Sequence, residues 1–182
     1  MSSVLTQNYF ELFSLPQRYV VDRAVLDARY RELQRSVHPD RFASSSDQER
    51  RVSIQHAAHI NEAYQVLKDP LKRGRYMLEL GGHPVAGQQG SHQDPAFLMQ
   101  QMELRERLGE VREQQDPLKA LDQLAKEIRD QYQALESGLA EALEAGQADL
   151  DKAFTLVQQM QFFTRLRDEI QELEADLEDE LL

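Results

Sequence analysis

Three consecutive residues, His38, Pro39 and Asp40, place an imidazole and a carboxylate on either side of a proline, where a basic helix is predicted to end. The proline ring fixes its own φ and also restricts the backbone of the residue before it. We therefore expect a stiff loop apex whose two polar side chains point outward. Because a stiff loop loses little entropy when a partner binds, the pattern favours an interaction role.

Four arginines surround this loop. A helical wheel places three of them on or beside the solvent side of the preceding helix, and the fourth follows the loop: Arg29, Arg31, Arg35 and Arg41. For Arg31 alone, an ordinary solvated helix face is the favoured explanation. Arg35 together with the loop favours contact with an acidic partner surface, which would act mainly on specificity and association rate.

Two histidines, His56 and His59, lie three positions apart on a predicted helix, a spacing at which both could ligate one metal ion. No H-E-x-x-H pattern or carboxylate group accompanies them, so two surface histidines are the favoured interpretation. The absence of cysteine excludes disulfides, thiolate metal sites and a cysteine nucleophile, and there is no G-x-x-x-x-G-K-[ST] phosphate loop. We expect no catalytic centre, metal or cofactor, and keep a histidine-based metal protein or enzyme as the alternative.

Charge is unevenly divided along the 182 residues. Residues 1–80 hold 12 Lys and Arg against 10 Asp and Glu, a net charge of +2, and residues 81–182 hold 9 against 22, a net charge of −13; the whole chain carries −11. This asymmetry suggests two modules with different partners, although a solvated acidic helical bundle would also explain the second half. An acidic total disfavours nucleic-acid binding, and no apolar run marks a membrane span or export signal. We expect no nucleic-acid or membrane partner and a cytoplasmic location.

The fold is predicted to be all-α, because helical periodicity recurs throughout and strand signals are few. A stretch rich in Gly, residues 81–93, is predicted to link a first module over residues 1–80 to a second over residues 94–182.

The first module is predicted to contain an antiparallel pair of long helices with a short helix at each end. A short apolar piece covers 8–13, and the first long helix follows an Asp22 N-cap and stops near His38, before the proline. The second long helix starts at Asp47, and a short helix restarted at Asp69-Pro70 runs to Leu80.

The second module is predicted to be a bundle of three helices with antiparallel neighbours, since the connections are short. Asp94-Pro95 opens a helix that reaches about Gln114, Asp116-Pro117 opens one that runs to Gly146, and Asp149 caps the third. The third helix has an apolar stripe, which a free-standing coiled coil would also explain: Leu166, Ile170, Leu173, Leu177 and Leu181.

The helix opened by Asp94-Pro95 has two apolar sides. One side is suited to packing in the bundle: Phe97, Leu104, Leu108 and Val111. The other combines apolar and acidic side chains: Leu98, Met99, Met102, Glu103, Glu106 and Glu110. Exposed Met and Leu rimmed by Glu would make an adaptable binding surface, but periodicity alone equally allows the bundle or the first module to cover it.

The first module resembles a J domain. Residues around the His38-Pro39-Asp40 loop stand where that family places them: Tyr9-Phe10, Leu12-Phe13, Tyr30, Leu33, Ile60 to Tyr64, Leu67 and Asp69-Pro70. Over essentially its whole length the chain is similar to the HscB family, the J-domain co-chaperones of bacterial iron–sulfur cluster assembly, through residues 38–43, the Asp69-Pro70-Leu71 junction and residues 97–106. It lacks the Gly/Phe-rich region and cysteine zinc modules of general J-domain chaperones. Arg41 stands where most J domains have Lys, which keeps the charge but changes its geometry.

The resemblance implies a non-enzymatic co-chaperone with two partners. A DnaK-type chaperone, HscA, would be bound and its ATPase stimulated through His38, Pro39, Asp40, Arg29, Arg31, Arg35 and Arg41. The scaffold protein IscU would be bound, and delivered to HscA for cluster transfer, through Leu98, Met99, Met102, Glu103, Glu106, Glu110 and Phe162.

The choice of Phe162 comes from the family pattern, since Phe162 and Phe163 lie equally far from the centre of the last apolar stripe. ATP and magnesium would belong to the chaperone, and we expect a monomer. A J-domain co-chaperone for a different client is the alternative.

Overall fold

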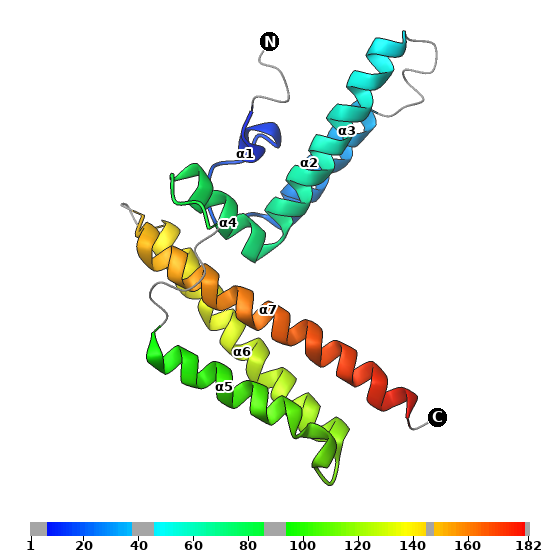
Figure 1. Cartoon of the computed structure of the whole chain (residues 1–182). Helices are drawn as coiled ribbons and strands as arrows, with labels where there is room; N and C mark the ends of the chain where they lie inside the picture. Colours follow the sequence, from blue (N-terminus) through cyan, green and yellow to red (C-terminus); the bar gives the residue numbers. More distant parts are fainter. Residues whose placement is uncertain (1–6, 38–45, 86–93, 145–147, 181–182) are drawn as a thin grey trace.

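The computed structural model describes residues 7–37, 46–85, 94–144 and 148–180, and every regular element among them is helical. Two helical units follow one another along the chain (Figure 1). The elements are α1 (Tyr9–Leu12), α2 (Arg23–Ser36), α3 (Asp47–Lys68), α4 (Pro70–Leu80), α5 (Pro95–Gly109), η3 (Val111–Glu113), α6 (Pro117–Glu144) and α7 (Leu150–Asp179).

The N-terminal unit is a hairpin of α2 and α3, with α1 and α4 packed at its base (Figure 1). Short polar side chains satisfy backbone N–H groups at the start of each helix: Asp22 caps α2, and Ser46 with Glu49 forms a capping box on α3. Apolar side chains from three helices form the core: Phe10, Phe13, Leu26, Ile60, Ala63 and Leu67. The antiparallel pair and short flanking helices predicted from the sequence are confirmed.

The C-terminal unit is a three-helix bundle in which α6 and α7 pack along most of their length. Consecutive helices run antiparallel, so α5 and α7 run in the same direction (Figure 1), and α5 also contacts α7 directly. Asp94 caps α5 and Asp149 caps α7, as predicted. The predicted helix from Pro95 to about Gln114 is interrupted: α5 ends at Gly109 and the chain continues as the 3₁₀ turn η3.

The apolar stripe of α7 packs inside this bundle, so α7 is not a free-standing coiled coil. Leu166, Ile170 and Leu177 are buried, and Leu173 packs against the same core. Leu181 lies outside the described residues.

Helix α4 joins the two units. On one side Tyr76 stacks on Tyr9 with ring centroids 4.3 Å apart and accepts the Tyr9 backbone N–H at 2.9 Å. On the other side Leu78 is fully buried in the bundle core, which also includes Tyr19 from the segment between α1 and α2. The division into 1–80, 81–93 and 94–182 stays a prediction, and α4 contributes to both cores.

Candidate functional site: two exposed helix faces

Helix α2 presents a basic face. Arg29, Arg31 and Arg35 are all exposed, as the helical wheel predicts. Arg29 pairs with Glu32 at 3.2 Å, while the Arg35 Nε donates to the Arg31 carbonyl at 3.2 Å. His38, Pro39, Asp40 and Arg41 lie outside the described residues, so the predicted loop apex stays a prediction.

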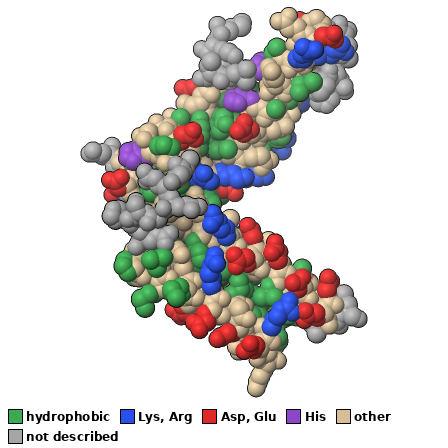
Figure 2. Space-filling model, in the orientation of Figure 1, with side chains coloured by type: hydrophobic (Ala, Val, Ile, Leu, Met, Phe, Trp, Pro, Cys, Tyr) green, Lys and Arg blue, Asp and Glu red, His purple; other side chains and the backbone are tan. Residues whose placement is uncertain are grey.

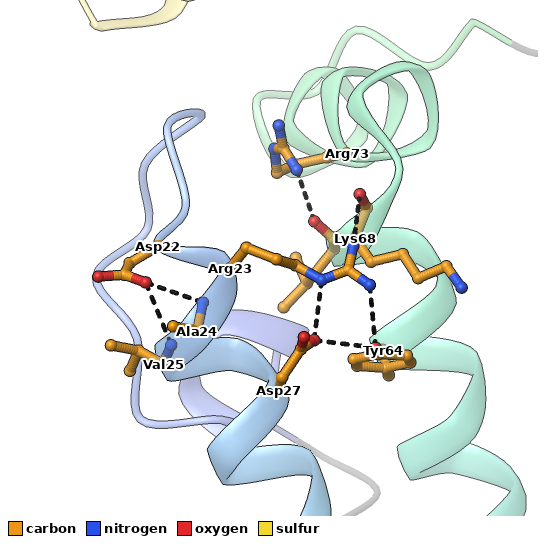
Figure 3. A network of polar contacts seen from close by, with 9 residues as sticks. Asp22, Arg23, Ala24, Val25, Asp27, Tyr64, Lys68 and Arg73 are labelled. Carbon is orange, nitrogen blue, oxygen red and sulfur yellow. Dashed lines mark hydrogen bonds and ion pairs between the residues drawn. The ribbon is translucent and has the colours of Figure 1, made fainter.

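A polar network fixes the other end of the α2–α3 hairpin (Figure 3). The Tyr64 hydroxyl donates to Asp27 at 2.9 Å, and Arg23 donates to both groups, at 2.8 Å to Asp27 and 3.1 Å to Tyr64. The Arg23 guanidinium and the Lys68 ammonium also lie 5.5 Å and 5.4 Å from the centroid of the Tyr64 ring. Sequence reasoning missed this network, which ties helices from distant parts of the chain.

The network shifts the titration of its members. The hydrogen bond from Tyr64, followed by the Arg23 contacts, holds the pKa of the Asp27 carboxyl below its ordinary value. Burial, followed by the hydrogen bond to Asp27, raises the pKa of the Tyr64 hydroxyl. Both shifts favour an ionised Asp27 carboxylate beside a neutral Tyr64 phenol. The network therefore has a structural role and holds α2 and α3 together at this end of the hairpin.

Helix α5 presents an exposed face that is apolar and acidic. Leu98, Met99 and Met102 expose 41%, 72% and 73% of their surface, which is high for side chains of this type. The three glutamates of the predicted stripe are exposed beside them: Glu103, Glu106 and Glu110. On the opposite side Phe97, Leu104 and Val111 are buried. Among the described residues, neither the bundle nor the N-terminal unit covers the stripe, so these six exposed side chains are accessible to a partner.

Phe162 does not share this exposure. Only 8% of its surface is exposed, and its ring packs edge-on against Phe97 with centroids 5.8 Å apart. Phe163 is buried still further, at 2%. Phe162 therefore lies beneath the seam between α5 and α7 rather than in the exposed stripe, and its assignment to the client contact stays a prediction.

Arg105 covers this buried ring. Its guanidinium carbon lies 5.9 Å from the centroid of Phe162, in a cation–π contact. Arg105 follows Met102 by three positions, so helical spacing places it on the same side of α5. Sequence reasoning did not single it out, although the spacing could have.

Both histidines of the pair, His56 and His59, lie on α3. In the part of the chain that the structure describes, no group of three or more His, Asp or Glu side chains is arranged to hold an ion. His59 instead packs edge-on against Tyr9, with ring centroids 5.6 Å apart. Within the same described ranges, none of the helices has the length and apolar character that crossing a membrane requires.

Comparisons with known proteins match each helical unit to a known domain family. A DnaJ domain model matches residues 8–76, and a model described as the HscB C-terminal oligomerisation domain matches residues 93–171. Co-chaperone protein HscB homologs from Cupriavidus taiwanensis and Photobacterium profundum are 43% and 42% identical; the matches cover 98% and 92% of this chain and 100% and 96% of theirs.

Solved structures agree with these matches. The structure of the chaperone HscB from Vibrio cholerae superposes with a TM-score of 0.83 and 37% identity, over 94% of this chain and 99% of that one. The crystal structure of the human co-chaperone protein HscB gives a TM-score of 0.86 and 30% identity, over 93% and 83%. A J domain implies a partner of the Hsp70 type. The chain therefore belongs to the HscB family of non-enzymatic J-domain co-chaperones.

Proposed function

We propose that this protein binds the iron–sulfur scaffold protein IscU on α5 and delivers it to the Hsp70-type chaperone HscA, whose ATPase it stimulates. The observation that carries the proposal is the exposed face of α5, where Leu98, Met99 and Met102 stand beside three glutamates. Exposed apolar side chains grouped on one helix face are typical of a protein-binding surface. The proposal also includes a role in cluster transfer and a cytoplasmic location.

The two exposed faces have opposite charge, which fits two different partners. Helix α2 offers exposed arginines and α5 offers exposed glutamates, on separate helical units; acidic side chains are prominent on the lower unit in Figure 2. A partner that complements one face would be repelled by the other, so charge directs HscA to α2 and IscU to α5. The loop residues His38, Pro39, Asp40 and Arg41 are assigned to the chaperone contact on the family pattern.

A monomer is part of the proposal. Leu98, Met99 and Met102 could in principle bury themselves against a second copy of α5. A two-fold interface places the same patch on both subunits, so it would bring two copies of each of the three glutamates into one interface: Glu103, Glu106 and Glu110. Like charges brought together in this way oppose self-association. Sedimentation velocity should give one species of 21.1 kDa.

The ATPase of HscA tests both units in one assay. We expect steady-state ATP hydrolysis by HscA to rise with this protein, and to rise further when IscU is added. His38→Gln should abolish the stimulation and leave IscU binding intact, because the loop and α5 belong to different units. Stimulation that survives His38→Gln would contradict the J-domain assignment.

Binding of IscU, measured by calorimetry, tests the α5 face alone. Leu98→Ala/Met102→Ala should weaken binding by about 10–100-fold, the effect expected when central apolar contacts are truncated. Val52→Ala/Ile54→Ala is a matched control, because those side chains on α3 are 42% and 63% exposed but lie outside the proposed face. If wild type does not bind IscU yet still stimulates the chaperone, the client is a different protein.

A further inference from the structure

The Arg105 side chain supplies a positive charge at one edge of the α5 face. Arg105 follows Leu98 by seven residues and Met102 by three, so the three side chains share one side of the helix. Arg105 is exposed, and its guanidinium lies over the Phe162 ring. It therefore borders the apolar part of the face on the side of α7.

The two arginines that follow Arg105 on α5 and η3 are already paired with carboxylates. Arg107 donates to the Glu127 carboxylate on α6 at 2.7 Å, and Arg112 pairs with Asp176 at 3.5 Å and with Glu180, both on α7. Among the described residues, Arg105 has no such carboxylate. A contact with the face of an aromatic ring leaves the N–H groups at the guanidinium edge able to donate to a partner.

Around the helix from Arg105, the glutamates lie beyond Leu98 and Met102, with Met99 among them. At 100° per residue, Glu106 lies about 100° around the helix from Arg105, and Glu103 and Glu110 lie further still. Going around α5 from α7 towards α6, the face is therefore first cationic, then apolar, then acidic. Figure 2 shows such an apolar patch on the lower unit, with basic side chains on one side and acidic side chains on another.

We propose that Arg105 is a specificity-determining residue of this face and binds a carboxylate of the client. The matching client surface has apolar side chains at its centre, basic side chains opposite the glutamates, and at least one acidic side chain opposite Arg105. Opposite charges on two sides of an apolar centre define one orientation of the client, because the reversed orientation would place like charges together. The inference rests on the proposed function and adds the chemistry of the partner surface.

Arg165 on α7 strengthens the cationic edge. It is exposed and lies three residues after Phe162, one helical turn along the same side of α7. Helical spacing thus places a second arginine one turn along α7 from Phe162, whose ring Arg105 contacts. A carboxylate of the client that reaches Arg105 gains from the second positive charge as well.

The sign of one substitution tests the inference. We expect Arg105→Gln to weaken IscU binding by about 3–10-fold, with most of the loss in the association rate at low salt, as is typical of a charge at the rim of an interface. Arg107→Gln is the matched control on the same helix and should change the affinity less than twofold, since its partner is Glu127. Tighter binding by Arg105→Gln would mean a uniformly basic client surface and would overturn the inference, and so would unchanged binding.

A conservative variant separates charge from packing on Phe162. Arg105→Lys keeps the positive charge and should retain most of the affinity, whereas a loss equal to that of Arg105→Gln would assign the effect to the ring contact and overturn the inference. Thermal unfolding of each variant reports any change in folding. Failure of wild type to bind IscU would overturn the proposed function together with the inference; binding with the wrong response at Arg105 overturns the inference alone.

Discussion

Gly74 on α4 packs against Leu139 on α6 so closely that a Cβ atom at position 74 would lie 2.7 Å from the Leu139 Cδ2. The Val157 side chain of α7 would lie 3.3 Å from the same Cβ. Glycine at this position lets the backbone of α4 approach the bundle, and this approach is what fixes the N-terminal unit against the C-terminal one. The contact also lies beside Tyr19, whose hydroxyl donates to the Pro70 carbonyl at 3.2 Å.

Gly74→Ala should therefore destabilise the protein. Alanine favours a helix by about 1 kcal/mol over glycine, but forcing a methyl group against a fully buried Leu139 should cost more, for a net loss of about 1–2 kcal/mol in urea unfolding. Gly138→Ala is the control, because its Cβ would meet only the Leu156 side chain at 3.6 Å, an ordinary contact. We expect Gly138→Ala to be neutral or stabilising. Equal stabilisation by the two substitutions would show that α4 does not need glycine.

The contribution of Asp27 to the free energy of unfolding should decrease as the pH falls. Its pKa is held below the ordinary value of 3.8, so the folded state favours the ionised carboxylate. The stabilisation is complete above that value and is lost as the pH falls through the lower pKa of the folded state. Wild type should thus be more stable than Asp27→Asn at neutral pH, and the difference should shrink below about pH 4.

Tyr64→Phe checks the physical cause of that shift. The Tyr64 hydroxyl is the main cause of the low pKa, so its removal should move the Asp27 carboxyl titration, followed by NMR, upward toward 3.8. The ring stacking of Tyr64 on Tyr30, with centroids 4.0 Å apart, is kept in this variant. An unmoved titration would assign the shift to Arg23 instead.

Local signals made most of the fold predictable. Asp22, Asp94 and Asp149 cap helices because their short carboxylates accept backbone N–H groups a few residues on, which a single sequence reveals. Periodicity also showed that Leu98 and Met102 fall off the apolar stripe that packs in the bundle, but it left open whether another part of the chain covers them, and only the structure shows that they are exposed.

Contacts between distant segments were not predictable from the pattern. Gly74 looks like a poor helix residue until the neighbouring Leu139 is seen, and Asp27 and Tyr64 meet only because the hairpin places them together. Phe162 and Phe163 lie symmetrically about the stripe of α7, so only the packing against Phe97 shows that both are buried. The role of Arg105 depends on that same packing.

Phe162 and Phe163 should behave as core residues. Each loses a buried ring when replaced by alanine, and each substitution should lower the free energy of unfolding by about 3–5 kcal/mol. A loss of IscU binding in Phe162→Ala would then include a change in the packing of α5. Phe162→Leu, which retains most of the volume, should recover both stability and binding. A change in stability of less than about 0.5 kcal/mol in Phe162→Ala would instead indicate a surface residue.

Substitutions on the exposed side of α5 should weaken client binding without lowering stability, and substitutions on its buried side should lower stability. Met102→Ala removes a side chain that is 73% exposed and should leave the free energy of unfolding within about 0.5 kcal/mol of wild type, while weakening IscU binding. Leu104→Ala, two residues later, removes a side chain that is 2% exposed and should cost about 2–5 kcal/mol in stability. Below its unfolding transition, Leu104→Ala should still bind IscU if the exposed face alone makes the contact. Wild-type affinity in Met102→Ala, measured by calorimetry, would remove this side chain from the proposed client contact.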